Sequence, residues 1–430
     1  MAFVPEYILL LGFAGGVDYV AGVLLGRTSS PASRRWVLGI ALGANLSVLV
    51  LFKYYNFLAQ TVIDVAGLGG VALSAPALQL ALPIGLSFHT FQGMSYVIEV
   101  FLRKQEPERH LGIFSVYVMF FPQLVAGPIE RPQSLLPQFR EAHRFNLQDA
   151  VVGSRLMLVG FVKKVVVADR LAILVDRVYA DPHAYAAPVL ALATVCFAFQ
   201  IYCDFSGYTD IARGAAQMVE FWRRWHISLS TWLRDFVYIP FGGNRSGFAR
   251  TQTNLLLTFM ISGLWHGANW TFVVWGLLNG LYVVVENRLG HRRVLPSPDR
   301  TSSSNRARSV VSVAMVFFLS CVAWTFFRAS SLGDAWFVLS EIASNPTELV
   351  DVRVIADAFA MVGMSQRSIV LCVLLCVGTF LFDAVVEHRI DAKRFTEWPR
   401  WLRWSTYYAS LAMLLLLGKY GEEQFIYFQF

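Results

Sequence analysis

Gly263-Leu-Trp-His-Gly-Ala-Asn-Trp270 places an ionisable side chain, that of His266, inside an apolar run that is otherwise long enough to cross a bilayer. A polar group at that depth costs free energy unless it has a partner or a chemical task. The stretch therefore predicts a membrane helix and makes His266 the first candidate for chemistry.

The whole chain has the composition of a membrane protein. Of its 430 residues, 56% are hydrophobic and 15% are charged, and the mean hydropathy is +0.51, which is far from the balance expected of a soluble domain. Apolar windows near the length that a bilayer requires predict an all-α fold, a polytopic transmembrane helical bundle of about 11 spans. The windows are 6–25, 36–58, 82–102, 111–128, 150–168, 187–203, 252–267, 268–286, 309–327, 368–387 and 403–418.

Basic residues gather in short loops between the windows, which the positive-inside rule places in the cytoplasm. These loops are 27–35, 103–109, 288–308 and 393–403. The acidic segment 328–366 and the C-terminal Phe425-Ile-Tyr-Phe-Gln-Phe430 then face outward. Since the net charge of +7 comes from these loops, we expect the lipid bilayer as a partner and no nucleic acid.

Glu6 and Asp18 flank or interrupt the first window, which predicts a retained span and not a signal peptide.

One window contains a helix break. Pro122, Gly127 and Pro128 interrupt the apolar run in Phe120-Phe-Pro-Gln-Leu-Val-Ala-Gly-Pro-Ile-Glu-Arg-Pro132. Backbone groups freed at membrane depth are tolerated only where protein buries them or where they line a cavity. A structural kink and a cavity wall both remain open here.

Residues 221–236 form the clearest amphipathic helix of the chain. Its apolar stripe recurs at spacings of three and four residues and consists of Trp222, Trp225, Leu229, Trp232 and Phe236. Tryptophans beside arginines are typical of the membrane interface, and His226 lies at the edge of the stripe. Pro240 and the turn residues of 242–244 are expected to end this helix.

Small residues surround His266 in the sequence. Gly263 and Gly267 form a small-xxx-small pair that Gly276 and Gly280 repeat, and such pairs permit close helix approach. His266 could therefore serve only to hydrogen-bond a neighbouring helix, and this structural alternative stays open.

A catalytic role also suits the residue type. A neutral imidazole can take a proton from a hydroxyl as the hydroxyl attacks a thioester carbonyl. Asn269 and Trp270 follow His266 at i+3 and i+4, so in a continuous helix they would share its face and orient the ring or a substrate. The cysteines lie in apolar surroundings without Cys-x-x-Cys or zinc spacing, which predicts buried thiols and no metal site. They are Cys196, Cys203, Cys321, Cys372 and Cys376.

Taken together, several ordered segments resemble the membrane-bound O-acyltransferase family, and within it the alginate O-acetyltransferase branch. The segments are Leu82-Pro-Ile-Gly-Leu-Ser-Phe-His-Thr-Phe-Gln92, Phe120-Phe-Pro-Gln-Leu-Val-Ala-Gly-Pro-Ile129, Asp204-Phe-Ser-Gly-Tyr-Thr-Asp210, Phe221-Trp-Arg-Arg-Trp-His-Ile-Ser-Leu-Ser-Thr-Trp-Leu-Arg-Asp235, Pro240-Phe-Gly-Gly-Asn-Arg245 and Gly263-Leu-Trp-His-Gly-Ala-Asn-Trp270. A single motif of this kind is weak, whereas the ordered set is specific and runs through nearly the whole chain.

The resemblance implies a single integral membrane acyltransferase domain over 1–430, with re-entrant or interfacial helices around a central funnel. It implies transfer of an acetyl group from a cytoplasmic thioester donor such as acetyl-CoA to a hydroxyl on the outer side. The family histidine corresponds to His266 and a second one to His226. Such an enzyme needs no cofactor or metal, works with an extracytoplasmic polysaccharide-acetylating partner protein, and resides in the bacterial cytoplasmic membrane. We assign donor or substrate contacts to Arg223, Arg224, Trp265, Asn269 and Asp204.

The chain departs from the family pattern at two places. It begins with less apolar sequence ahead of Val4 to Gly26 than family members have. The family also places a connector with Asn-Phe and Pro-Tyr elements between the two motif helices, whereas here Met218 runs through Val219 and Glu220 directly into Phe221. The missing connector puts the placement of His226 relative to His266 in question.

Three other functions remain open. A relative that esterifies teichoic acid with D-alanine would use the same histidine. Loss of the connector would leave a catalytically inactive scaffold. A transporter would use Asp204, Asp210, Lys53 and His266 as an ion path, although no inverted repeat is visible.

Overall fold

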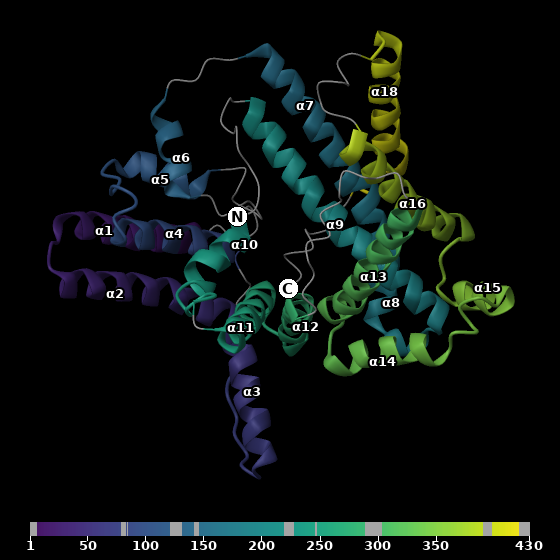
Figure 1. The fold of residues 1–430 in the computed structure, drawn as a ribbon, viewed down its shortest axis with the longest axis horizontal. Coiled ribbons are helices and arrows are strands. Elements are labelled where there is room, and N and C mark those ends of the chain that lie inside the picture. Colours follow the sequence, from purple (N-terminus) through teal and green to yellow (C-terminus); the bar gives the residue numbers. More distant parts are fainter. Residues whose placement is uncertain are drawn as a thin grey trace. The chain divides into compact units, whose positions relative to one another are not determined.

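The computed structural model describes residues 7–78, 83, 85–120, 131–141, 146–218, 228–245, 247–288, 303–389 and 398–420. These residues form helices and no strand (Figure 1), so the all-α prediction is confirmed. The helices belong to two compact units. Unit 1 comprises Met1–Leu156 and Ala212–Val237, and unit 2 comprises Met157–Ile211 and Tyr238–Phe430. The prediction of one domain over 1–430 stays a prediction.

Helices occupy the predicted apolar windows at least in part. They are α1 (Tyr7–Arg27), α2 (Pro31–Leu49) continued by the π-helix η1 (Val50–Tyr54) and α3 (Tyr55–Leu68), α4 (Leu86–Phe101), α5 (Leu111–Met119), α7 (Leu147–Phe161) continued by the π-helix η4 (Val162–Ala168), α9 (Ala187–Met218), α11 (Phe248–His266), α12 (Trp270–Arg288), α13 (Ser303–Arg328), α16 (Gln366–Arg389) and α18 (Arg400–Leu417). Shorter helices link them, namely α6 (Pro132–Leu135), η3 (Pro137–Arg140), α8 (Asp169–Ala180), η5 (Pro182–Ala184), α10 (Ser228–Leu233), η6 (Arg234–Tyr238), α14 (Leu332–Ser344) and α15 (Val352–Met361).

Five helical stretches among the described residues are long and apolar enough to cross a membrane. They are Tyr7–Arg27, Pro31–Leu68, Ala187–Ala216, Val311–Arg328 and Gln366–Asp383. The polytopic membrane character is thus confirmed, whereas the count of about 11 spans is not.

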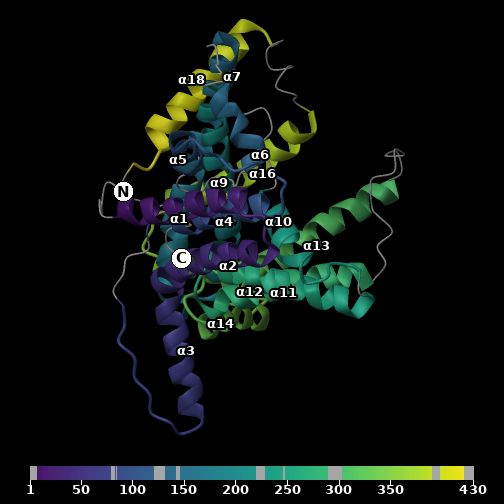
Figure 2. The same ribbon diagram turned by 90° about the vertical axis from the view of Figure 1, so that its left-hand side faces the viewer.

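In unit 1, α1, α2 and α4 pack side by side (Figure 2). Asp18, the acid that interrupts the first window, is buried and accepts a hydrogen bond from Asn45 Nδ2 at 2.7 Å. Gly93 of α4 makes room for it, because a Cβ there would collide with the Asp18 carboxylate. Arg34, from the first basic loop, is also buried and donates to the carbonyl of Phe101 at 2.8 Å. This bond satisfies a free carbonyl at the end of α4.

The span predicted at 111–128 is described only in its first part, and its remainder lies outside the described residues. The described helix there, α5, ends at Met119 after nine residues, which is about 14 Å and too short to cross a bilayer. Beyond it, Arg131 Nη1 lies 3.2 Å from Glu99 Oε1, and Arg140 Nη2 lies 2.6 Å from Glu108 Oε2. Arg131 thus lies beside the last turn of α4, and Arg140 lies beside the segment that follows it. The proline-rich break at 121–130 itself lies outside the described residues.

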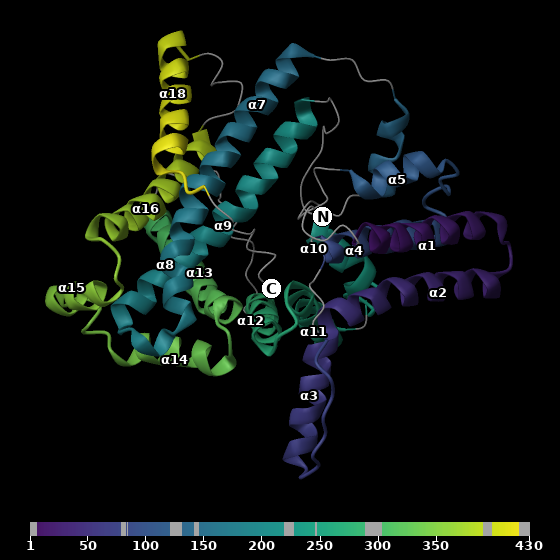
Figure 3. The same ribbon diagram turned by 180° about the vertical axis from the view of Figure 1, so that it is seen from behind.

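Unit 2 is built around α8 and α9, against which α13, α14 and α16 pack (Figure 3). Its core is apolar and closely filled, with Leu171, Leu174, Phe197, Phe327 and Val338 all buried. The predicted burial of the cysteines is confirmed for Cys196, Cys203, Cys372 and Cys376, whereas Cys321 is half-buried.

Candidate active site

His266 is the last residue of α11, in unit 2. The chain turns over the next three residues and continues as α12 from Trp270. α11 and α12 lie against each other along their length, as two views of the ribbon agree (Figures 1 and 2). His266 therefore lies at the tip of a helical hairpin and not in the middle of a continuous span.

The predicted close approach of these helices is confirmed. A Cβ built at Gly263 would lie 3.2 Å from the Cα of Gly276 and against the carbonyl of Phe272. Gly276 in turn faces the carbonyl of Phe259. Only residues without a side chain permit such backbone contact. The crossing brings the first turns of α12 beside the end of α11, and so beside His266.

Aromatic rings surround the imidazole of His266, which is half-buried. The centroids of Trp265, Trp275 and Phe327 lie 4.9, 5.0 and 5.5 Å from its own, at interplanar angles of 74°, 80° and 67°. These rings come from the three helices α11, α12 and α13. Edge-to-face contacts on several sides restrict rotation of the imidazole. A reacting side chain requires support of this kind.

The helical premise for Asn269 and Trp270 is wrong, because α11 ends at His266. Asn269 Oδ1 accepts from the backbone N–H of Thr271 at 3.2 Å, and its Nδ2 donates to the carbonyl of Ser330 at 3.2 Å. The first bond satisfies a free N–H at the start of α12. The structure thus shows Asn269 holding the hairpin turn, and Trp270 is exposed.

Asp204 belongs to a buried charge cluster formed by residues of α9, η4 and the start of α8. Its Oδ1 lies 2.5 Å from Lys164 Nζ, which is also 2.7 Å from Asp169 Oδ1. The neighbouring Lys163 Nζ lies 2.8 Å from Asp210 Oδ2. Asp204 and Asp210, the two acids of the ion path expected for a transporter, thus each form an ion pair with a lysine. Whether Asp204 also contacts a substrate stays a prediction.

These lysines were not singled out from the sequence, although they interrupt the apolar window 150–168. Charged residues within a membrane segment usually pair with a partner, so their position was a usable signal. They lie in η4, where the backbone departs from α-helical geometry. The aromatic partners Trp275 and Phe327 were also missed, because they are apolar residues in apolar helices. No sequence signal separates them from other core residues.

In unit 1, the described part of the amphipathic segment docks on α4. Trp232 is buried and Arg234 is exposed, as the predicted stripe requires. Arg131 forms ion pairs with both Glu99 of α4 and Asp235. Trp232 thus packs on protein, and the predicted place of this segment at the membrane interface stays a prediction.

The remaining predicted site residues Arg223, Arg224 and His226 lie outside the described residues, as does the junction at 219–221. Their roles stay predictions. In the described part of the chain no group of three or more His, Cys, Asp or Glu side chains is arranged to hold a metal ion. The expectation that no cofactor is needed remains untested.

Comparison with known proteins identifies the family. The sequence model of the membrane-bound O-acyltransferase family matches residues 49–327, a range that includes His266 and the helices around it. The chain belongs to this family.

Individual relatives agree with the assignment. The chain is similar to the probable alginate O-acetylase AlgI of Pseudomonas aeruginosa, with 36% identity over 77% of this chain and 65% of that protein. It is similar to the peptidoglycan O-acetyltransferase of Helicobacter pylori, with 30% identity over 78% of this chain and 69% of that protein. It is also similar to the teichoic acid D-alanyltransferase of Streptococcus thermophilus, with 24% identity over 59% and 70%. The chain spans 65% of the length of the first relative.

Proposed function

We propose that the chain is an O-acyltransferase that passes an acetyl group from a cytoplasmic thioester donor, such as acetyl-CoA, to an exported polysaccharide or to an extracytoplasmic acetyltransferase partner. The setting of His266 carries this proposal. It ends α11 at the tip of a tight hairpin, its ring is held by three aromatic side chains, and it lies within the region that the family model matches.

The reaction assigns one proton transfer to His266. The imidazole accepts the proton of the acceptor hydroxyl while the hydroxyl oxygen forms a bond to the thioester carbonyl carbon. The C–S bond then breaks, the thiolate leaves, and the imidazolium returns the proton to it. No electrons are exchanged with a redox partner. A ring that cannot rotate freely holds the accepting nitrogen in one direction, which lowers the entropy cost of the transfer.

The named relatives support acetyl over D-alanyl transfer. The alginate O-acetylase and the peptidoglycan O-acetyltransferase are more similar to this chain than the D-alanyltransferase. An acceptor of the polysaccharide class follows from the same two names. We also propose that the protein resides in the bacterial cytoplasmic membrane.

The test compares His266→Gln with His183→Gln in the native host. Gln keeps a hydrogen-bonding side chain of similar reach but cannot act as a base. His183 is an exposed histidine of the same unit that lies 3.4 Å from Asp334 Oδ1, so its substitution controls for loss of an imidazole. We expect His266→Gln to lower the ester-linked acetyl content of the exported glycan by about 10²–10⁴-fold, at unchanged membrane abundance, and His183→Gln to have little effect.

The unmodified chain must be assayed first, beside a version with the family connector inserted before Phe221. Activity only in the second would show that this chain is an inactive scaffold. Near-normal acetylation by His266→Gln would refute the catalytic role. Detection of D-alanine in place of acetate in the ester fraction would mean that the donor carries D-alanine and not acetate.

Arg223 and Arg224 provide a separate test of the donor. Arginine's planar fork suits the phosphates of a CoA thioester. In the double variant Arg223→Gln, Arg224→Gln we expect weaker binding of acetyl-CoA to the purified protein and a smaller dependence of binding on salt. Equal affinities and equal salt dependence would leave these arginines only an anchoring role.

A further inference from the structure

Two arginines of α8 line a small pocket in unit 2, apart from the hairpin of His266. Arg170 and Arg177 are two helical turns apart, about 10 Å along the axis, and share one face of α8. The pocket has a volume of about 150 Å³ and is bounded on its other side by the turn at Gly363 and the first turns of α16, with Ser368 and Cys372 in its wall.

Both guanidinium groups are held by backbone carbonyls. Arg170 Nε donates to the carbonyl of Leu417 at 2.5 Å, and Arg177 Nη1 donates to the carbonyl of Val362 at 2.8 Å. Gly363 has a φ of +67°, which lets the chain turn sharply beside Arg177. A carbonyl takes up one N–H of a group that has several.

Neither arginine has a carboxylate partner among the described residues. The nearby Arg328 differs, since its Nη2 lies 2.7 Å from Asp176 Oδ1. Two positive charges therefore meet at one pocket that contains a hydroxyl donor and no acid. An anion with several oxygens satisfies such a site, and paired arginines suit phosphate in particular.

The pocket lies on the side of unit 2 predicted to face outward. Arg177 contacts Val362, which belongs to the acidic segment 328–366, and the pairing of Arg328 with Asp176 connects the same segment to α8. Arginine asymmetry places this segment outside the membrane. The site is thus expected at the depth of the outer headgroups.

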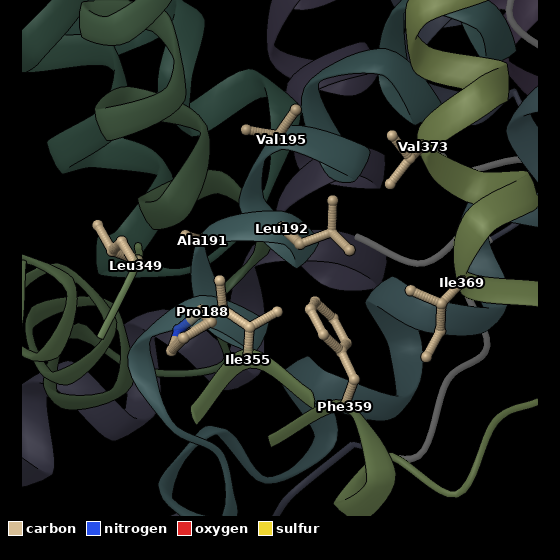
Figure 4. A pocket seen from close by; sticks show the side chains of 9 residues that line it. All are labelled: Pro188, Ala191, Leu192, Val195, Leu349, Ile355, Phe359, Ile369 and Val373. Atoms are coloured by element: carbon tan, nitrogen blue, oxygen red, sulfur yellow. The ribbon is translucent and has the colours of Figure 1, made fainter. Parts of the chain in front are cut away.

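An apolar groove and the pocket are both lined by side chains from the first turns of α16. The groove has a volume of about 440 Å³, and it runs between α9, α15 and α16 (Figure 4). All nine side chains that line it are apolar, including Leu192, Phe359 and Ile369. Ile369 is next to Ser368 of the pocket, so groove and pocket lie on neighbouring faces of the first turns of α16. This is the arrangement of a headgroup site beside an acyl-chain site.

We propose that Arg170 and Arg177 bind the phosphate of an anionic phospholipid of the outer leaflet, and that an acyl chain of this lipid occupies the groove between α9, α15 and α16. The lipid holds the start of α16 and the end of α15 against α8. This site is separate from the proposed acyl transfer and does not depend on it.

The test measures lipid binding to the full-length protein by native mass spectrometry from detergent, with phosphatidylglycerol, phosphatidylcholine and inorganic phosphate as separate probes. We expect preferential retention of phosphatidylglycerol. The double variant Arg170→Gln, Arg177→Gln should weaken its binding about tenfold or more, the loss expected for a charge-assisted hydrogen bond. Arg353→Gln, an exposed arginine of α15, should bind like the unmodified chain.

A second variant tests the groove without touching the arginines. Ala191→Phe fills it from α9 and should weaken phosphatidylglycerol binding while leaving any binding of inorganic phosphate unchanged. Equal phosphatidylglycerol binding by the arginine double variant and by Arg353→Gln would overturn the proposal. Tight binding of inorganic phosphate with no effect of Ala191→Phe would show a free-anion site instead of a lipid site.

Discussion

The indole of Trp232 stacks on the ring of Phe91, with centroids 4.0 Å apart and planes 7° apart. Its Nε1 also donates to Ser95 Oγ at 2.6 Å, so both the face and the polar edge of the indole are used. Through this contact α10, which follows the motif with Arg223, Arg224 and His226, is bound to α4.

Replacing Trp232 should separate the two contributions. Trp232→Phe keeps an aromatic ring but loses the donor to Ser95, which should cost about 1 kcal/mol. Trp232→Ala also leaves a cavity and should cost about 3–5 kcal/mol. Thermal unfolding in detergent measures both, with the exposed Trp336→Ala as control. If Trp232→Ala and the control Trp336→Ala have the same melting temperature, the indole does not hold α10 against α4.

The ion pair of Asp235 predicts a dependence on pH. Burial acts to raise the pKa of this carboxyl, but hydrogen bonds from Arg234 and Arg131 and their charges outweigh burial and hold the pKa below its ordinary 3.8. A lowered folded pKa means that the stabilisation is complete above the ordinary value and is lost as the pH falls through the folded one.

We therefore expect unfolding of unit 1 to become easier below about pH 4, and Asp235→Asn to remove part of this dependence. The measurement is the melting temperature of both proteins between pH 6 and pH 3. Parallel curves for the two would mean that Asp235 contributes no pH-dependent stability.

The tight contact of Gly263 with α12, close to His266, predicts that a Gly→Ala substitution has opposite effects at two helix positions. Gly263→Ala inserts a methyl group against the backbone of α12 and should destabilise the protein by about 1–3 kcal/mol. In Gly43→Ala the new methyl meets nothing within 4 Å, so helix propensity should make the change neutral or stabilising by up to about 1 kcal/mol. Acetylation should fall only with Gly263→Ala. Equal melting temperatures would contradict the tight crossing.

The cluster around Lys164 predicts an order of severity. Lys164→Gln leaves the buried carboxylates of Asp204 and Asp169 without their shared cation and should cost about 3–5 kcal/mol. Asp204→Asn leaves Lys164 paired with Asp169 and should cost less. Lys163→Gln breaks the single, more exposed pair with Asp210 and serves as comparison. If Lys164→Gln is no worse than Lys163→Gln, the cluster does not stabilise unit 2.

The arginine asymmetry predicts that position 303 lies in the cytoplasm and position 344 outside. Single cysteines replacing Ser303 and Ser344, in a background without native cysteine, should be labelled differently by a membrane-impermeant thiol reagent added to intact cells. Only position 344 should react. Reaction at 303 and not at 344 would reverse the topology.

Much of the helical framework was predictable because hydrophobicity along the chain is a local property. The windows around α1, α9, α13 and α16 coincide with helices long enough to span a membrane. In the window 111–128 the described helix α5 ends at Met119, and the rest of the window lies outside the described residues. After that gap, Arg131 pairs with Glu99 of α4 and Arg140 with Glu108, which follows α4; such pairs are invisible in a sliding window.

The candidate site divides in the same way. The sequence by itself determined that His266 is an exceptional polar group in an apolar region, that Gly263 and Gly276 permit close packing, and that the chain resembles a family of acyltransferases. Only the tertiary structure decided that α11 ends at His266, which rings surround the imidazole, and that Lys164 lies between two carboxylates. The physical reason is that helix formation depends on neighbours in the chain, whereas these contacts join residues far apart in sequence and depend on how whole helices pack.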